Sequence, residues 1–239
     1  NKSKFFIKPE NTEEVSVILA EANQRGIQLV PVGGSTGLVG GQVAGKNDQV
    51  SLSLEKMSAI SFSREDNLVT VQAGAILSDI KRIAFDAGRL FPLSIASEGS
   101  CQIGGNLATN AGGLNVLRYG SARDLCLGLE AVLPDGSIVS SMKALKKNNM
   151  GFDIKSLLIG SEGTLAVITS AILKTYPLPI DPLTAVISVN DPLDALNIFN
   201  SMSEIFNDRL MAFELMKYTG IDFLKKTGIR VRYPFSEKA

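Results

Sequence analysis

The sequence of 239 residues contains no histidine and no tryptophan. Histidine is the side chain that most often serves as a general base near neutral pH, so its absence removes the usual proton acceptor of many enzymes. The segment Gly33 to Gly37 matches the G-x-S-x-G pattern of serine hydrolases, yet without histidine the usual triad cannot form. Any chemistry performed here therefore depends on a bound cofactor or on residues outside this chain.

An excess of charge of one sign is also missing, since 24 Lys and Arg residues balance 24 Asp and Glu residues. A nucleic-acid-binding protein needs a basic face that displaces counterions from phosphates, so this balance argues against such a partner. No apolar stretch reaches the roughly 18 residues of a membrane-spanning helix. The first residues are too short an apolar run for a signal peptide. We expect a cytoplasmic protein, or one of the mitochondrial matrix in a eukaryote.

Metal and nucleotide motifs are scarce as well. The two cysteines, Cys101 and Cys126, do not have the paired spacing of a metal site, and no metal is predicted. The G-x-G-x-x-G motif of Rossmann dinucleotide-binding domains does not occur. Gly40 to Lys46 spells the G-x-x-x-x-G-K of a P-loop, but Asn47 stands where the magnesium-binding Ser or Thr should be.

The hydrophobic pattern predicts alternating strands and helices. In the first part we expect two helices, one capped by Asn11 or Thr12 and ended by Gly26, and one over 76–87. Strands are expected over 27–32, 50–54, 68–72 and 165–175. A hairpin is expected in which 127–133 pairs with 137–140 around Pro134-Asp135-Gly136. After a linker at 176–179, a strand over 183–189, a helix opened by Asp191-Pro192 and a strand over 211–215 are expected. We therefore predict one domain at 1–178, with subdomains at about 1–56 and 57–178, and the beginning of a second at 179–239.

The first chemical signal is the glycine-rich segment PVGGSTGLVGG at Pro31 to Gly41, into which the strand over 27–32 leads directly. Glycines allow consecutive backbone N–H groups to turn toward one point, and they leave no side chain in the way of a ligand. A concave row of such donors suits pyrophosphate. A flexible loop between strands is the alternative, and the preceding strand favours the anion site. On this interpretation, Gly34→Val should block the ligand while much of the fold stays intact.

The second signal runs from Glu98 to Gly113, where glycine and alanine are so dense that a large planar group could lie against bare backbone. Thr109 and Asn110 would supply the polar contacts that orient it. Such a run makes a poor helix, because each glycine costs up to about 1 kcal/mol of helix stability. A packing seam of small residues is the alternative. The third signal, Ile159 to Leu165, is a turn before a strand and says little on its own.

In order and spacing, these runs resemble the FAD domain of the vanillyl-alcohol-oxidase-type, or PCMH-type, flavoproteins of the FAD-linked oxidase family. The segments that carry the resemblance are PVGGSTGLVGG (31–41), GSCQIGGNLATNAGG (99–113), RYG (118–120) and IGSEGTLAVIT (159–169). The most similar branch comprises D-2-hydroxyglutarate dehydrogenase, D-lactate dehydrogenase and the glycolate oxidase FAD subunit. The resemblance covers residues 7–180 and continues at Ala212 to Met216.

The resemblance implies an α+β fold, with a PCMH-type FAD-binding domain of two α/β subdomains and the start of a truncated α+β substrate (cap) domain. It implies FAD as cofactor, held non-covalently because no histidine can tether it and Cys101 is a poor candidate. The residues it assigns to FAD are Val32, Gly33, Gly34, Ser35, Thr36, Gly37 and Leu38 around the pyrophosphate, Gly99, Ser100, Gly104, Gly105, Thr109, Asn110, Gly112 and Gly113 along the flavin and ribityl chain, and Gly163 and Ile168 through backbone groups.

The family reaction oxidises a D-2-hydroxy acid to the 2-oxo acid and passes hydride to the flavin. The resemblance therefore implies a small 2-hydroxy acid as substrate and a quinone or an electron-transfer protein as electron acceptor, and it allows a homodimer. In this family the carboxylate-binding Arg and the basic His come from the second domain, past the end of this chain, so no catalytic residue is assigned. Arg118 is the nearest candidate, and a solvated loop arginine is the simpler interpretation of it.

Two other functions remain open. The enolpyruvyl reductase of cell-wall synthesis shares the FAD-binding fold but uses NADPH, and the segment ATNAGG at 108–113 argues against this function. A non-catalytic FAD-binding or electron-transfer subunit, whose catalytic partner is a separate chain, is the other alternative.

Overall fold

The computed structural model describes residues 3, 5–145, 149, 151–228 and 235. The chain divides into two compact units, Asn1–Leu178 and Pro179–Ala239. Helices and strands are mixed in the first unit, which contains one parallel and two antiparallel sheets, so the α+β class is confirmed. Among the described residues, no helix has both the length and the apolar character needed to cross a membrane.

A three-stranded parallel sheet opens the first unit. Its strands are β1 (Phe5–Ile7), β3 (Val50–Ser53) and β2 (Leu29–Val32), in that spatial order. Helix α1 (Thr12–Arg25) connects β1 to β2. The Asn11 side chain accepts a hydrogen bond from the Glu14 N–H at 2.8 Å, and Gly26 ends the helix in the left-handed conformation, with φ 65°. Both predicted ends of this helix are confirmed, with Asn11 as the capping residue.

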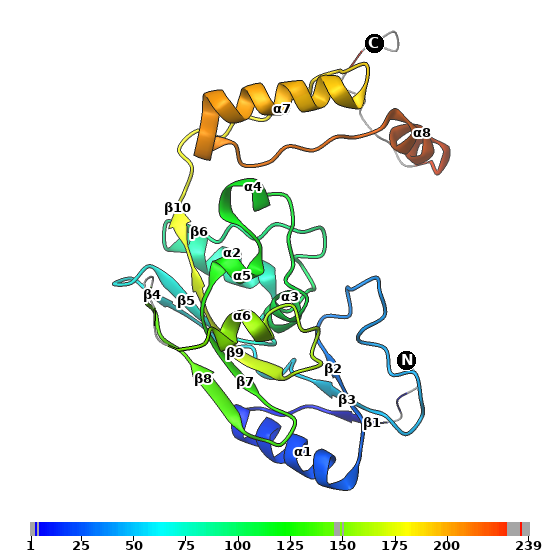
Figure 1. Cartoon of the computed structure of the whole chain (residues 1–239), viewed down its shortest axis with the longest axis vertical. Coiled ribbons are helices and arrows are strands. Elements are labelled where there is room, and N and C mark those ends of the chain that lie inside the picture. The colour runs from blue at the N-terminus through cyan, green and yellow to red at the C-terminus, as the bar shows by residue number, and fades with distance from the viewer. Residues whose placement is uncertain (1–2, 4, 146–148, 150, 229–234, 236–239) are drawn as a thin grey trace. The chain divides into compact units, whose positions relative to one another are not determined.

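A five-stranded antiparallel sheet forms the rest of the framework. In spatial order its strands are β4 (Ile60–Ser63), β5 (Leu68–Gln72), β9 (Val167–Lys174), β7 (Cys126–Val132) and β8 (Ile138–Ser141). The predicted hairpin joins β7 to β8, and Gly136 adopts φ 88° in its turn. Helix α1 packs on this part of the sheet, where the Ser16 hydroxyl donates to the Gly136 carbonyl at 2.6 Å (Figure 1).

One hydrophobic core joins the two sheets. It combines Val15 and Leu19 of α1, Leu52, Leu54 and Met57 around the end of β3, Ala73 directly after β5, and Val132 and Val167 of the antiparallel sheet. Burial of one such large apolar side chain contributes about 1.5–3 kcal/mol. The loop that follows β2 and the turns that precede β9 therefore start from a shared, rigid base.

Short helices fill the glycine-rich middle of the chain, between α2 (Leu77–Asp86) and β7, and again before β9. They are α3 (Ile103–Ala108), α4 (Val116–Tyr119), α5 (Ala122–Leu125) and α6 (Ile154–Leu158). The expectation that the second glycine run makes a poor helix is wrong at α3. A Cβ on Gly104 would lie 2.6 Å from the Ala73 Cβ, so the glycine lets α3 pack directly on the chain that leaves β5. This packing offsets the low helix propensity of glycine.

The predicted linker at 176–179 is only partly a linker. Tyr176–Pro177 forms β10, which pairs with β6 (Arg89–Leu90) in an antiparallel two-stranded sheet. The Tyr176 ring also meets the Tyr119 ring edge to face, with centroids 4.7 Å apart. This contact between distant parts of the chain has no local sequence signal.

The second unit contains α7 (Pro192–Phe206), the 3-10 turn η1 (Asn207–Arg209) and α8 (Tyr218–Lys226). Asp191 caps α7 by accepting from two backbone N–H groups, at 2.7 and 2.9 Å, which confirms the predicted helix start. The strands predicted over 183–189 and 211–215 are wrong, because neither segment pairs with another strand among the described residues. Apolar alternation favours a strand, but a strand also needs a hydrogen-bonded neighbour.

Candidate cofactor site

The first and second glycine runs are in direct contact. A Cβ on Gly34 would lie 2.1 Å from the Ser100 carbonyl oxygen and 2.9 Å from the Cys101 Cα, so no side chain fits there. The bare face of Gly34 therefore makes room for the protein's own backbone. The expectation that valine at this position would block a ligand while sparing the fold has the wrong physical basis, because the side chain would first collide with Ser100.

The neighbouring Gly33 faces helix α3. A Cβ on Gly33 would lie 3.7 Å from both the Gln102 Oε1 and the Gly105 Cα, which is ordinary contact. A Cβ on Gly105 would meet no atom within 4 Å. The end of β2 thus packs beside the start of α3, and the space next to Gly105 is open.

The third run contacts both of the other runs. A Cβ on Gly163 would lie 3.4 Å from the Pro31 side chain at the end of β2. The Gly160 and Glu162 N–H groups donate to the Leu107 and Ala108 carbonyls of α3, at 3.1 and 2.8 Å. Segments that are more than a hundred residues apart in sequence are therefore joined around one place in the fold.

Unused hydrogen-bond donors gather in the first run. Within the described part of the chain, the backbone N–H groups of residues 34–38 donate to no acceptor. Ser35 has φ 53°, and the Gln42 side-chain amide donates to the Gly37 carbonyl at 3.0 Å, which folds the loop back on itself. Consecutive free N–H groups around a left-handed residue form the kind of concavity that binds phosphate oxygens.

Backbone strain is distributed over all three runs. Ser35, Asn110 and Glu162 are non-glycine residues with φ between 48° and 55°, one in each run. Asparagine tolerates this region well, whereas serine and glutamate adopt it less readily. Such conformations cost of the order of 1–3 kcal/mol each and persist where the surrounding structure imposes them, often at ligand sites.

The glycines of the second run are of two kinds. At Gly104 and Gly113 a Cβ would collide with the protein, 2.6 Å from the Ala73 Cβ and 2.2 Å from the Ser94 carbonyl oxygen. At Gly99 and Gly105 the space is open. The interpretation as a packing seam is therefore confirmed at Gly104 and Gly113, whereas the open space at Gly99 and Gly105 leaves room for a ligand.

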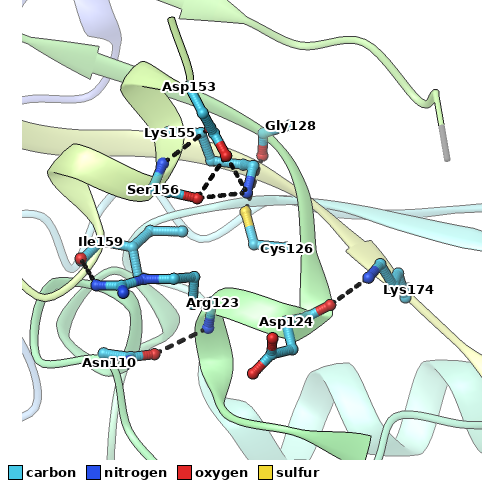
Figure 2. Close-up of polar contacts among 10 residues, drawn as sticks. All are labelled: Asn110, Arg123, Asp124, Cys126, Gly128, Asp153, Lys155, Ser156, Ile159 and Lys174. Atoms are coloured by element: carbon cyan, nitrogen blue, oxygen red, sulfur yellow. Dashed lines mark hydrogen bonds and ion pairs between the residues drawn. The ribbon is translucent and has the colours of Figure 1, made fainter. Parts of the chain in front are cut away.

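Arg123 of α5 links the second run to the third (Figure 2). Its backbone N–H donates to the Asn110 Oδ1 at 3.0 Å, and its guanidinium Nη2 donates to the Ile159 carbonyl at 2.6 Å. A capping box at Ser121 and Asp124 holds this short helix, and the Ser121 N–H lowers the pKa of the Asp124 carboxyl. Sequence reasoning missed Arg123, which follows the RYG motif closely.

A second polar cluster precedes the third run, also in Figure 2. The Asp153 carboxylate accepts from the Ser156 hydroxyl at 2.6 Å and from the Ser156 N–H at 3.0 Å, and these bonds lower the pKa of Asp153. Beneath it, burial raises the pKa of the Cys126 thiol to about 12. Cys126 is therefore a protonated, unreactive thiol that donates to the Gly128 carbonyl.

Two buried amides lie in α3 and at its start. Gln102 and Asn106 are 8% and 6% exposed, and no described residue donates a hydrogen bond to the Gln102 Oε1 or the Asn106 Oδ1. The Nε of Arg123 is the other buried polar side-chain atom without a partner among the described residues. Sequence reasoning gave no role to Gln102 or Asn106. Their signal was a pair of polar residues four apart among glycine and apolar residues.

The remaining predicted residues are dispersed around this centre. Val32 is the buried last residue of β2, and Ile168 is buried in β9 opposite Ala131. Leu38 is 99% exposed, and Gly112 lies beside Val116. Thr109 is exposed, and its hydroxyl donates a hydrogen bond to the Gly105 carbonyl. Arg118 is exposed, with its guanidinium 5.1 Å from the centre of the Tyr119 ring. No cluster of potential metal ligands occurs in the described ranges.

These features fit FAD. The free N–H row offers donors for a pyrophosphate, the open faces of Gly99 and Gly105 leave space for a bulky group, and the unpartnered amides offer polar contacts beside them. Residues 3–141 match the family described as FAD binding domain.

Curated proteins of similar sequence carry related names. The chain is 41% identical over 226 residues to a mitochondrial protein of Schizosaccharomyces pombe provisionally named a D-lactate dehydrogenase, covering 94% of this chain and 43% of that protein. It is 41% identical over 215 residues to mitochondrial D-2-hydroxyglutarate dehydrogenase of Rattus norvegicus, covering 90% and 40%. It is 38% identical over 236 residues to D-2-hydroxyglutarate dehydrogenase of Xanthomonas citri, covering 96% and 48%. The chain thus spans less than half the length of these relatives.

Solved structures share the fold at lower identity. Alkyldihydroxyacetonephosphate synthase aligns with a TM-score of 0.64 and 24% identity, over 74% of this chain and 31% of that one. Xylooligosaccharide oxidase from Myceliophthora thermophila aligns with a TM-score of 0.65 and 22% identity, over 74% and 36%. The fold is that of PCMH-type flavin oxidases, and the chain belongs to the FAD-binding domain family, with FAD as its cofactor.

Proposed function

We propose that this chain is the FAD-binding part of a dehydrogenase that oxidises a D-2-hydroxy acid, of the D-2-hydroxyglutarate or D-lactate type, to the 2-oxo acid. The observation that carries the proposal is the convergence of the three glycine runs around free backbone donors at residues 34–38. The substrate class is supported by the names of relatives that are 38–41% identical to this chain.

In this proposal each run has its own task. The N–H groups of 34–38 bind the pyrophosphate, and the backbone at Gly99 and Gly105 lies along the ribityl chain and the ring. Asn110, held by the Arg123 N–H, and the turn at Gly163 fix the position of the ring. Bound FAD supplies the hydride acceptor, and the residues of this chain bind it and orient it toward the substrate.

We further propose that FAD is held without a covalent bond. One solved protein of this fold, the glucooligosaccharide oxidase of Acremonium strictum, is described with a 6-S-cysteinyl, 8α-N1-histidyl FAD. The present chain has no histidine, Cys101 is only 2% exposed, and burial raises the pKa of Cys126 to about 12. None of these residues offers an accessible nucleophile for a tether.

No catalytic base is assigned within these 239 residues, since the chain has no histidine. The second candidate function, a non-catalytic FAD-binding or electron-transfer subunit, is favoured by the same observation. In either case we propose that electrons pass to a quinone or an electron-transfer protein. A homodimer and a location in the cytoplasm or mitochondrial matrix are part of the proposal, the latter because the fission yeast and rat relatives are named as mitochondrial.

The test combines flavin binding with turnover. The 239-residue chain, the complete gene product and the rat enzyme as positive control are titrated with FAD and then assayed for dye reduction with D-2-hydroxyglutarate, D-lactate and glycolate. We expect FAD binding by all three, and turnover of at least one substrate only by the two complete proteins. A chain that binds no FAD contradicts the proposal. Comparable turnover by the 239-residue chain places the base within it, and a complete product without turnover favours the electron-transfer subunit.

A further inference from the structure

The amides of Gln102 and Asn106 are unusual because they are buried and their carbonyl oxygens accept no hydrogen bond from any described residue. They lie on one face, since the Asn106 N–H donates to the Gln102 carbonyl at 3.1 Å and the two residues are one helical turn apart. Residues at this spacing have Cβ atoms about 5–6 Å apart. A buried polar group without a partner is costly, so a protein that retains two of them side by side needs a reason.

The position of Gln102 connects this pair to the cofactor site. The Gln102 Oε1 lies 3.7 Å from the place of a Cβ on Gly33, at the beginning of the loop that carries the free N–H row. Gly105, between the two amides in sequence, faces open space. Gln102 therefore lies beside the start of the loop that carries the free N–H row, and Asn106 follows one helical turn later.

The chemistry of the unpartnered atoms restricts what they can bind. Both are carbonyl oxygens, which accept hydrogen bonds and need an O–H or N–H donor. An ionised pyrophosphate has no proton to donate, so the phosphate groups themselves do not satisfy these oxygens. The groups attached to the two sides of the pyrophosphate of FAD, the ribityl chain and the adenosine ribose, both carry hydroxyl donors.

We propose that Gln102 and Asn106 bind the sugar-type hydroxyl groups next to the pyrophosphate of the cofactor. This assignment rests on the FAD binding proposed above. The N–H row then holds the anionic centre, and the two amides hold the polyol beside it. An empty site keeps both amides desolvated and unpaired, and binding of the cofactor relieves that cost.

The proposal predicts effects of opposite sign on stability and on affinity. In the 239-residue chain without cofactor, Gln102→Leu and Asn106→Leu should leave the thermal unfolding midpoint unchanged or raise it, because each removes an unpartnered amide. The same variants should raise the Kd for FAD, measured by titration of flavin fluorescence, by about tenfold per lost hydrogen bond.

A matched control is available in Gln72, whose Oε1 accepts from the Ala59 N–H at 3.0 Å. Gln72→Leu should lower the unfolding midpoint and leave the Kd for FAD unchanged. If Gln102→Leu and Asn106→Leu behave like this control, the amides are structural and the proposal is overturned. If the unaltered chain binds no FAD, the proposed function itself is wrong. If the unaltered chain binds FAD and both variants bind it with the same Kd, only the assignment of the amides is wrong.

Partial ligands identify which hydroxyls are bound. If the variants have a higher Kd for FMN and an unchanged Kd for ADP, the amides bind the ribityl chain. If they have a higher Kd for ADP and an unchanged Kd for FMN, the amides bind the adenosine ribose. Lumiflavin, which has the ring without the ribityl chain, should bind to all variants equally. A loss of affinity for lumiflavin places the amides on the ring and contradicts the proposal.

Discussion

The Ser100 carbonyl oxygen lies where a side chain of Gly34 would stand, 2.1 Å from the position of its Cβ. This contact joins the loop after β2 to the segment before α3. Gly163, whose Cβ position is 3.4 Å from the Pro31 side chain, brings the third run to the same strand end. The geometry of the candidate cofactor site therefore depends on close backbone contact between segments that are far apart in sequence.

The first prediction compares two glycines of this region. Gly34→Ala should destabilise the fold by about 3 kcal/mol, because the methyl group meets a backbone carbonyl that cannot move freely. Gly105→Ala should leave the cofactor-free protein as stable or raise its stability by up to about 1 kcal/mol, since alanine favours the helix and meets no atom within 4 Å. Urea unfolding measures both effects.

With FAD present, Gly105→Ala should weaken cofactor binding by at least about tenfold while the protein remains folded, because its methyl group enters the open space where we place the cofactor. Titration of flavin fluorescence measures this change. Unchanged affinity of Gly105→Ala would place the flavin elsewhere. A fully stable Gly34→Ala would show that the two runs can move apart.

Asn110 provides a test of backbone strain at the site. Its φ is 48°, and its Oδ1 accepts from the Arg123 N–H at 3.0 Å. Asn110→Gly should lose about 1 kcal/mol for this hydrogen bond. Asn110→Ala should lose about 1 kcal/mol more, because alanine disfavours the left-handed conformation. Asn110→Asp keeps both the acceptor and the tolerance of this conformation, and serves as the control. Equal stability of the glycine and alanine variants would contradict the strain argument.

The buried thiol of Cys126 predicts a pH effect. Its pKa rises from 9.0 to about 12 on burial, so between these values the folded protein keeps the proton while the unfolded chain loses it. The contribution of Cys126 to stability is therefore fully present below pH 9 and is lost as the pH rises toward 12. Cys126→Ala should show a smaller alkaline decrease in unfolding free energy. Parallel curves for the two proteins would exclude this assignment.

The attachment of FAD can be decided by denaturation. Because the chain lacks histidine and both cysteines are buried, acid precipitation of the flavin-loaded protein should leave the yellow colour in the supernatant. Absorbance of the two fractions near the flavin bands measures the partition. Colour that remains with the washed pellet would show a covalent bond and would direct attention to Cys101.

Much of the framework could be predicted because its causes are local. Asn11 and Gly26 bound α1, Asp191 caps α7, and Gly136 turns the hairpin through interactions within a few residues. The strands expected over 183–189 and 211–215 depended on a distant partner, and none is formed among the described residues. Helix α3 depended on a distant contact too, that of Gly104 with Ala73, and the sequence argued against it.

The sequence by itself determined the family, since the four segments at 31–41, 99–113, 118–120 and 159–169 carry the resemblance that implies FAD. Only the tertiary structure decided the task of each residue. Gly34 and Gly105 look alike in the sequence, yet one packs on Ser100 and the other faces open space. The role proposed for Gln102 and Asn106 rests on their burial, which leaves both amide oxygens without a partner among the described residues. Long-range packing sets these environments, and no local pattern encodes which atoms of a distant segment arrive there.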